Sequence, residues 1–293
     1  EYNKNKNYYS KGFLKEESSM SEIQSVHYPQ SEIHTTLIPV TTGCPYNRCA
    51  FCSMYKDNTY SEIPLREIEH ELMNGNTYTE RVFLTGADPL SIGFEKMFRV
   101  LELIKKYFPY CGCVAAYASV RSLQKYSVEE LQKLHAEGLR LLYVGFETGN
   151  DEVLRLMKKG HTSEIAANQG KKLNEAKIPF YAIIMYGIAG EGNGKKNAKL
   201  TAELLNQFVP TKIITMNLTV FEMTELAEMV KKGIFVEASI KEKLLELKTL
   251  LEQLHIEKSV ELDTTHTTNI IKMTGRIPEQ TKEMIERIEH LLI

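Results

Sequence analysis

Apolar residues form two kinds of pattern that alternate along the chain from residue 33 onward. Continuous runs rich in Val, Ile, Thr and Tyr are typical of strands that are buried on both faces of a sheet. They predict strands at residues 33–42, 80–86, 112–119, 139–149, 178–190 and 211–221. Between these runs, apolar residues recur at helical spacing and predict helices at residues 62–73, 93–107, 127–138, 162–176 and 195–208.

Strands and helices that alternate in this way predict a parallel sheet with right-handed crossovers. Six such units are too few for a closed eight-stranded barrel, so we predict an α/β fold, a partial TIM barrel of the (β/α)6 type with parallel strands. We expect a polar N-terminal arm over residues 1–32, the partial barrel over 33–221, and a helical C-terminal segment over 222–293 that covers the barrel opening. Amphipathic patterns in the last segment predict helices at 237–257 and 279–293.

Composition narrows the class of protein. The chain has 293 residues, of which 43% are hydrophobic and 25% charged, values that exclude collagen-like and wholly disordered proteins. A net charge of −2 counts against a broad surface for nucleic acid. Because we find neither an apolar run of about 18 residues nor an apolar signal-peptide core, we expect no membrane span and a cytoplasmic protein.

Cysteine usage is the strongest anomaly in the sequence. An odd number of cysteines without an export signal favours a reducing compartment, where clustered thiols are more often metal ligands or redox groups than disulfides. Two of them, Cys111 and Cys113, lie at the start of the third predicted strand, at the opposite end of a barrel from the other three. The five are Cys44, Cys49, Cys52, Cys111 and Cys113.

The other three cysteines, Cys44, Cys49 and Cys52, follow the first predicted strand, at the end of a parallel barrel where catalytic residues gather. Three thiolates without a fourth suit an iron–sulfur cluster with one open iron. A zinc loop completed by a distant histidine, such as His27 or His34, is the alternative.

This cysteine loop, residues 43–52, resembles the signature of the radical S-adenosylmethionine (SAM) enzymes. Their usual pattern is C-x3-C-x2-C with an aromatic residue before the last cysteine, a place that Phe51 takes here. The sequence departs from the pattern in having four residues between Cys44 and Cys49.

Two further motifs follow at the next strand ends. Residues 85–89 are similar to the family's Gly-Gly-Glu-Pro motif, whose backbone carbonyls take the SAM amino group, although an ordinary turn is the alternative. The resemblance assigns cofactor binding there to Gly86, Ala87 and Asp88. After the third strand, Ser119 is expected to contact the ribose or methionine part of SAM. Arg121 is expected to bind the SAM carboxylate, unless it is a solvated charge at a helix start.

The fourth strand end, residues 145–162, resembles the subgroup of methylthiotransferases, elongator-type enzymes and oxygen-independent coproporphyrinogen oxidase. The resemblance implies that Glu147 accepts hydrogen bonds from the ribose hydroxyls. Lys159 takes the place of a family Arg near the SAM carboxylate, which replaces a bidentate fork by a point charge.

The fifth strand ends in a turn similar to the subgroup's Gly-Leu-Pro-Gly-Glu turn, which lies beside the adenine. Gly187 and Ala189 are therefore further candidates for cofactor binding. The acidic residue that coproporphyrinogen oxidases place on this strand is Ile183 here, which counts against that activity.

Taken together, the resemblance implies a [4Fe-4S] cluster on the three cysteines, SAM as second cofactor, and a reductant such as flavodoxin or ferredoxin. The radical obtained from SAM would take hydrogen from a small-molecule, tetrapyrrole-like or peptide substrate. His266, in the polar segment 263–269, is a candidate catalytic residue at the barrel mouth, with a hydrogen-bonded turn as the alternative. An RNA-modifying radical SAM enzyme and a non-enzymatic iron–sulfur or zinc protein remain alternative functions.

Overall fold

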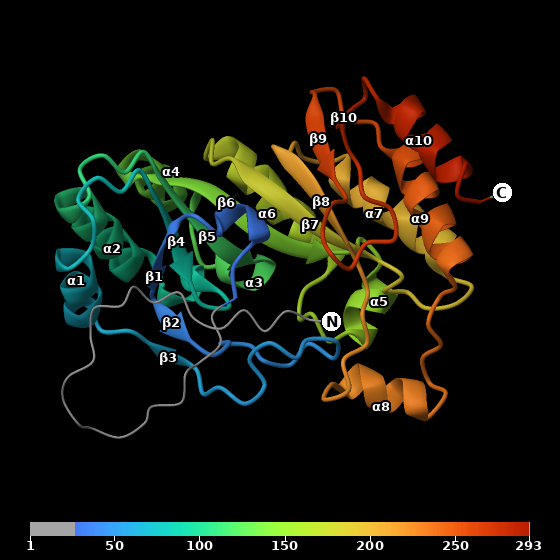
Figure 1. The fold of residues 1–293 in the computed structure, drawn as a ribbon, viewed down its shortest axis with the longest axis horizontal. Coiled ribbons are helices and arrows are strands. Elements are labelled where there is room, and N and C mark those ends of the chain that lie inside the picture. Colours follow the sequence, from blue (N-terminus) through green and yellow to red (C-terminus); the bar gives the residue numbers. More distant parts are fainter. Residues whose placement is uncertain (1–26, 293) are drawn as a thin grey trace.

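The predicted strands assemble into one curved sheet, which is the central layer of the structure (Figure 1). The structure is a computed structural model and describes residues 27–292. Neighbouring strands from β1 to β9 are parallel, whereas β10 is antiparallel to β9. The predicted α/β partial barrel is therefore confirmed. Within the described residues, the sheet order is β1 (Thr36–Pro39), β4 (Arg81–Thr85), β5 (Cys113–Ser119), β6 (Leu139–Glu147), β7 (Phe180–Tyr186), β8 (Lys212–Asn217), β9 (Val260–Asp263) and β10 (Thr274–Ile277).

Helices connect the strands and pack against one face of the sheet. Local signals fix their ends: Ser127 and Glu130 form a capping box at the start of α4, and Gly138 ends it with φ at +125°. The α-helices are α1 (Leu65–Met73), α2 (Phe94–Tyr107), α3 (Val120–Leu123), α4 (Val128–Glu137), α5 (Asp151–Leu156), α6 (Ser163–Glu175), α7 (Gly194–Leu205), α8 (Glu225–Lys231), α9 (Ile240–Gln253) and α10 (Thr281–Glu289). Short elements are the 3-10 helices η1 (Gln30–Glu32) and η2 (Pro89–Ile92) and the antiparallel pair β2 (Thr41–Thr42) and β3 (Ser61–Glu62).

Alternate residues of each strand face the two sides of the sheet. In β6, Leu142 and Val144 join the large core under the helices, while Leu141 and Tyr143 face the barrel interior. Aromatic rings fill this interior, because Tyr143 lies edge-on to Phe83 at 5.9 Å and to Tyr181 at 4.9 Å between ring centroids. The interior is therefore a packed core over this part of its height.

The predicted N-terminal arm falls mostly outside the described residues, which begin at His27. Its last residues pack against the amino end of the barrel. The Glu32 side chain is fully buried and accepts hydrogen bonds from Arg81 Nε at 2.8 Å and from Tyr143 Oη at 2.7 Å. The end of the arm is thus tied to β4 and β6.

The C-terminal segment differs from the helical segment that the sequence predicts. Two of its helices are present as α9 and α10, but β9 and β10 lie between them and extend the sheet beyond β8. β9 pairs in parallel with β8, so that Leu262 lies opposite Ile213. Each of the two strands has four residues, too short for their alternating burial to stand out in the sequence. In the described part of the chain, no helix has the length and apolar character that a membrane crossing requires.

Candidate active site at the carboxyl ends of the strands

The cysteine loop runs between β2 and β3 and is anchored by backbone hydrogen bonds to distant segments. Ala50 N donates to Met157 O at 3.0 Å, and Leu226 N donates to Ala50 O at 2.9 Å. Within the loop, Asn47 has a left-handed φ of +47°, and its backbone N donates to Cys44 Sγ at 3.3 Å. The two backbone bonds of Ala50 fix the loop against the carboxyl end of α5 and the start of α8.

An apolar cluster surrounds the loop and joins it to three other strand ends. Ala50 and Phe51 belong to it, together with Ala189 of the turn after β7. The predicted site residues Phe51 and Ala189 are thereby brought into one cluster. Its other members are Val153, Met157, Met185, Ile188, Leu218, Val220, Leu226, Met229, Val230 and Phe235.

Glu147 and Lys159, predicted from one motif, form an ion pair beside the cysteines. Lys159 Nζ donates to Glu147 Oε1 at 2.8 Å, and the two side chains are 13% and 10% exposed. Burial would lower the pKa of Lys159, but the charges of Glu147 and Cys49 raise it above its ordinary value. The ammonium also lies 5.9 Å from the ring centroid of Phe51. The structure therefore places a fixed positive charge next to the cysteine loop.

Glu147 itself adopts a left-handed φ of +63°, an unusual conformation for a residue with a side chain. Such strain is concentrated at functional sites, where the surrounding structure holds it in place. It turns the chain sharply at the end of β6, immediately before Thr148, which is fully buried.

Asp88 and Ser119, assigned to two different motifs, are hydrogen-bonded to each other. Ser119 Oγ donates to Asp88 Oδ2 at 2.5 Å, and Ser122 Oγ donates to Asp88 Oδ1 at 2.8 Å. Burial raises the pKa of Asp88 against the effect of these bonds. These hydrogen bonds therefore tie the turn after β4 to the end of β5.

At Gly86, the backbone of the turn after β4 closely approaches Thr41. A Cβ at this position would lie 2.1 Å from Thr41 Oγ1, so only glycine fits between β4 and β2. The neighbouring Ala87 is half-buried. The motif at residues 85–89 thus contacts Thr41, which precedes the cysteine loop by two residues.

Arg121 also reaches the cysteine loop. Its guanidinium carbon lies 4.3 Å from the ring centroid of Tyr46, and Nη1 donates to Gly160 O at 3.2 Å. The side chain is exposed, yet it bridges the loop and the segment that carries Lys159. No sequence pattern singles out Tyr46, because its contact with Arg121 depends on the fold.

Two buried polar atoms near these motifs have no hydrogen-bond partner among the described residues. They are Thr41 Oγ1, beside Gly86, and His161 Nε2, two residues after Lys159. Burial, followed by the charge of Lys159, lowers the pKa of His161 to about 3, so its ring is neutral near pH 7. Orphaned polar atoms are expected where a ligand completes a site. Neither residue was predicted; His161 could have been found from its place in the Lys159 motif.

His266 lies on the loop after β9, at the same end of the sheet. The loop is held there by Asn269 Nδ2, which donates to Thr215 O at 2.7 Å, and by Ile270 N, which donates to Tyr186 Oη at 3.0 Å. His266 is half-buried, and its Nδ1 shares a hydrogen bond of 2.8 Å with Thr268 Oγ1. The described contacts connect this loop to β7 and β8 but not to the cysteine loop.

The three loop cysteines match an iron–sulfur cluster in number and kind of donor. All three are half-buried free thiols, and burial raises the pKa of Cys49 and of Cys52. Within residues 27–292, no three His, Cys, Asp or Glu side chains are arranged to hold a single metal ion. Three cysteine thiolates are the donors that an iron–sulfur cluster with one open iron takes.

The two remaining cysteines lie at the opposite end of the barrel, as expected. Arg81 Nη1 donates to Cys113 Sγ at 2.8 Å, and Cys111 Sγ donates to Cys113 O at 3.5 Å. Of the two histidines in the zinc alternative, His27 and His34, His27 packs its ring on Tyr55 at 5.2 Å between centroids. Among residues 27–292, no histidine joins the loop cysteines in a group of three or more that could hold one metal ion.

Solved structures resemble the chain in fold. Methylornithine synthase (PylB) has a TM-score of 0.52 at 16% identity, with 88% of this chain and 81% of that chain covered. Coproporphyrinogen III oxidase (HemN) from Escherichia coli has a TM-score of 0.56 at 17% identity, with 75% and 51% covered. The archaeal Methanocaldococcus infernus Elp3 with an N-terminal deletion has a TM-score of 0.52 at 16% identity, with 88% and 63% covered. The chain thus spans about half to four fifths of these proteins.

Among curated proteins, no relative matches the chain. The family model of the Radical SAM superfamily matches residues 38–197, which is more than half of the 293 residues and includes the cysteine loop. The matched residues also include Glu147, Lys159 and Gly187, and they follow the barrel from β1 to the start of α7. The chain therefore belongs to the Radical SAM superfamily, whose members are enzymes that use a [4Fe-4S] cluster and SAM.

Proposed function

We propose that this enzyme cleaves SAM reductively and takes a hydrogen atom from a small-molecule, tetrapyrrole-like or peptide substrate. The observation that supports this most is the buried Glu147–Lys159 pair beside Cys49 at the carboxyl ends of the strands. When bound, the cluster and SAM supply the electron transfer and the 5′-deoxyadenosyl radical that such a reaction requires.

In this proposal the chain's own residues bind and orient SAM. Cys44, Cys49 and Cys52 hold the cluster, and Glu147 accepts hydrogen bonds from the ribose hydroxyls. Lys159 holds the SAM carboxylate as a point charge, without the fork that an arginine would offer.

Arg121 is the second cation for the same carboxylate, because it contacts the Lys159 segment through Gly160. Backbone carbonyls at Gly86 and Ala87 accept from the SAM amino group, and Gly187 and Ala189 face the adenine. The apolar cluster around Phe51 excludes water from the reacting atoms.

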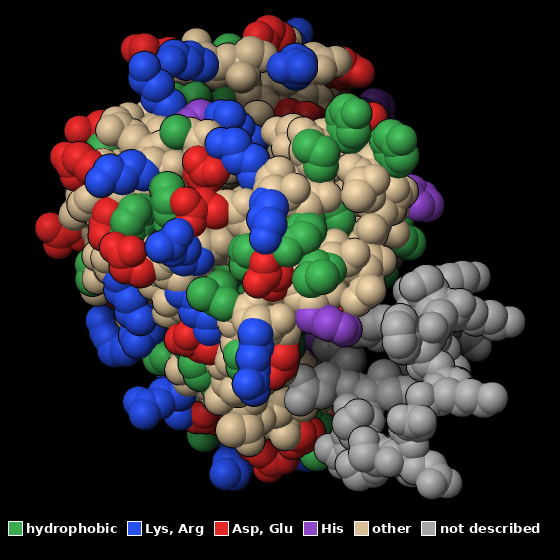
Figure 2. Space-filling model, turned by 90° about the vertical axis from the view of Figure 1, so that its left-hand side faces the viewer, with side chains coloured by type: hydrophobic (Ala, Val, Ile, Leu, Met, Phe, Trp, Pro, Cys, Tyr) green, Lys and Arg blue, Asp and Glu red, His purple; other side chains and the backbone are tan. Residues whose placement is uncertain are grey.

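Two observations bear on the substrate class: the charges on the surface (Figure 2) and the apolar Ile183 side chain in the barrel interior. Lys, Arg, Asp and Glu side chains are interspersed on the face shown in Figure 2, without a broad area of one sign. This agrees with the net charge of −2 and favours a small molecule or peptide over RNA. Ile183 faces the aromatic interior, so the proposal does not extend to coproporphyrinogen oxidation. An RNA-modifying enzyme remains the second candidate.

The partners follow from the chemistry. One electron must reach the cluster for each cleavage, and we propose a flavodoxin or ferredoxin in the cytoplasm as its source. His266 is proposed to contact substrate, because its loop is fixed over the ends of β7 and β8.

The decisive experiment is anaerobic reconstitution followed by incubation with SAM and dithionite. Formation of 5′-deoxyadenosine in the wild type and its absence in Cys52→Ser would support the proposal. Cys111→Ser is the matched control and should behave as wild type. An iron-loaded protein that forms no 5′-deoxyadenosine would refute it and leave the electron-carrier alternative.

A further inference from the structure

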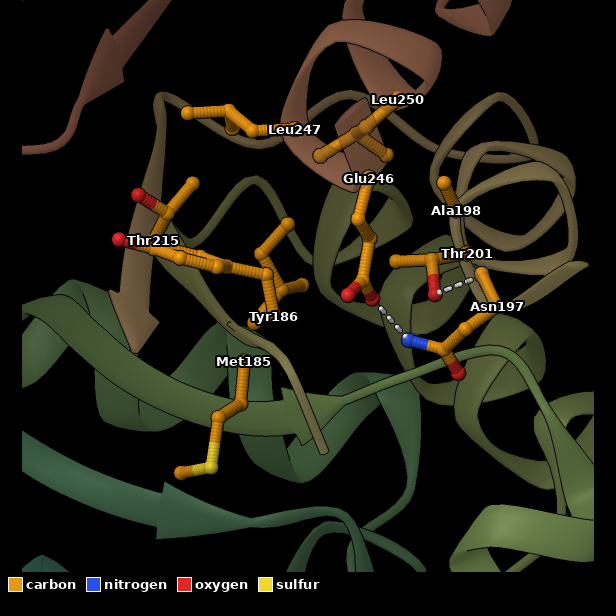
Figure 3. A pocket seen from close by; sticks show the side chains of 10 residues that line it. Met185, Tyr186, Asn197, Ala198, Thr201, Thr215, Glu246, Leu247 and Leu250 are labelled. Atoms are coloured by element: carbon orange, nitrogen blue, oxygen red, sulfur yellow. Dashed lines mark hydrogen bonds between the residues drawn. The ribbon is translucent and has the colours of Figure 1, made fainter. Parts of the chain in front are cut away.

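A buried carboxylate from the C-terminal segment lies behind the SAM-binding strand ends. Glu246 of α9 is 2% exposed. Its Oε2 accepts from Gly187 N at 2.8 Å, and its Oε1 accepts from Asn197 Nδ2 at 2.7 Å (Figure 3). One side chain thus connects α9 with the turn after β7 and with α7.

The hydrogen bonds continue to the end of β6. Thr148 Oγ1 donates to Asn197 Oδ1 at 2.6 Å and accepts from Asn150 N at 3.0 Å. Thr201 Oγ1 accepts from Gly149 N at 3.1 Å. The network therefore reaches the three residues that directly follow Glu147, and it joins them to the Gly187 turn.

Even without the hydrogen bond to Glu246, the turn at Gly187 has little conformational freedom. Gly187 has a φ of +77°, and a Cβ there would lie 2.7 Å from Lys243 Cε, so the position requires glycine. The backbone N–H of Gly187 points at the carboxylate, and a cavity of about 10 Å³, room for about one water molecule, lies beside it. A buried carboxylate is costly unless it is hydrogen-bonded, and the two oxygens of Glu246 have Gly187 N and Asn197 Nδ2 as donors.

We propose that Glu246 is a positioning residue that fixes the strand ends after β6 and β7 and thereby sets the affinity for SAM. The inference rests on the proposed function, because it assumes that Glu147 and Gly187 face SAM. It assigns part of the cofactor site to a helix that lies outside the matched residues 38–197.

The titration of Glu246 offers a readout that packing alone would not give. Burial raises its pKa to about 7, and hydrogen bonds from Asn197 and Gly187 oppose this rise. Glu242 and Lys243 of the same helix act on it electrostatically, and Tyr186 of β7 faces it across the cavity. Below the pKa the carboxyl is neutral and carries a hydrogen of its own, so it is a weaker acceptor for the two N–H donors. The hydrogen bond from Gly187 N to Glu246 should therefore weaken as the pH falls from 8 to 6.

The test compares Glu246→Gln with Glu242→Gln, a neighbour on α9 whose Oε1 lies 3.4 Å from Gly194 N. SAM dissociation constants are measured by equilibrium dialysis on reconstituted protein between pH 6 and 8, and amide exchange of Gly187 is measured before reconstitution. We expect Glu246→Gln to keep its iron, to weaken SAM binding about tenfold at pH 8, to lose the pH dependence of the wild type, and to exchange Gly187 faster. Glu242→Gln should bind SAM with wild-type affinity at pH 8. Because it removes a charge that raises the pKa of Glu246, its pH dependence should move to lower pH without being lost.

Unchanged affinity and pH profile in an iron-loaded Glu246→Gln protein would overturn the inference. If that variant does not fold, Thr148→Val removes the link to Asn197 with little change in volume, and wild-type affinity in this variant would overturn the inference equally. If the wild type itself binds no SAM, the proposed function fails first.

Discussion

Both ends of the barrel combine a carboxylate, a cation and a thiol, but their hydrogen-bonding groups are satisfied to different degrees. At the amino end, Glu32 accepts from Arg81, Tyr143 and Thr35, and Arg81 also donates to Cys113. Every strong donor and acceptor there has its partner in the chain. This cluster fastens the N-terminal arm to the barrel.

At the carboxyl end the corresponding groups are less satisfied. Glu147 has Lys159 as its partner, and the cysteine loop beside them is held mainly through its backbone. Thr41 and His161 add unpaired polar atoms to this end. The comparison teaches that buried charge and sulfur do not by themselves identify a site, and that unused hydrogen-bonding capacity beside them distinguishes the carboxyl end.

Cysteine variants should give the largest contrast between the two ends. Replacing Cys49 by Ser should abolish cluster binding, whereas the double variant Cys111→Ser, Cys113→Ser should still bind about four irons per chain. Iron and sulfide analysis after anaerobic reconstitution measures this. Loss of iron in the double variant would mean that the ligands are assigned to the wrong end.

Glu147→Ala should weaken SAM binding by ~1.5–3 kcal/mol, the range for a hydrogen bond to a charged group, and leave the iron content unchanged. Dialysis against labelled SAM gives the affinity. A folded variant with wild-type affinity would remove Glu147 from the site.

Glu32→Gln should act on stability and not on SAM. Because Arg81 is 37% exposed, we expect a loss of about 1–2 kcal/mol in the free energy of unfolding, less than for a fully buried pair. Denaturant titration measures this loss, and SAM affinity in the same variant is the control.

The pKa of Glu32 is shifted in the opposite direction to that of Glu246, so its contribution is lost only at a lower pH. Burial alone would raise the pKa of Glu32, but hydrogen bonds from Arg81, Tyr143 and Thr35 hold it below its ordinary value of 4.5. Its contribution is therefore complete above pH 4.5 and is lost as the pH falls through the lowered pKa. Melting temperatures in acid should fall more steeply for the wild type than for Glu32→Gln; parallel curves would contradict this.

The smallest expected effect is that of His266→Ala. It should reduce substrate conversion and leave SAM cleavage without substrate unchanged, as the ratio of product to 5′-deoxyadenosine would report. Truncation before Leu262 is a poorer test, because it removes Leu262, Ile277 and Ile288 from the large core. An equal ratio of product to 5′-deoxyadenosine in the wild type and in His266→Ala would mean that the loop has only a structural role.

The sequence predicts those parts of the molecule that have a local signal. The six parallel strands β1, β4, β5, β6, β7 and β8 are continuous apolar runs, and the cysteine loop and the Glu147–Lys159 segment are motifs within single stretches of chain. β9 and β10 have no comparable signal, because four residues of alternating burial also occur in loops. Glu32 and Glu246 look like ordinary polar positions of an arm and of an amphipathic helix. Only the packing of distant elements buries them.

The anchoring of the cysteine loop has a consequence for how the enzyme matures. Ala50 receives its backbone hydrogen bond from Leu226, and its own N–H donates to Met157, both more than a hundred residues later in the chain. Contacts of such long sequence separation form late, after the intervening units have folded. The ribosome must therefore release most of the barrel before the loop acquires its shape. Delivery of iron and sulfide is then expected to follow synthesis, and a nascent chain that ends before α8 should not retain them.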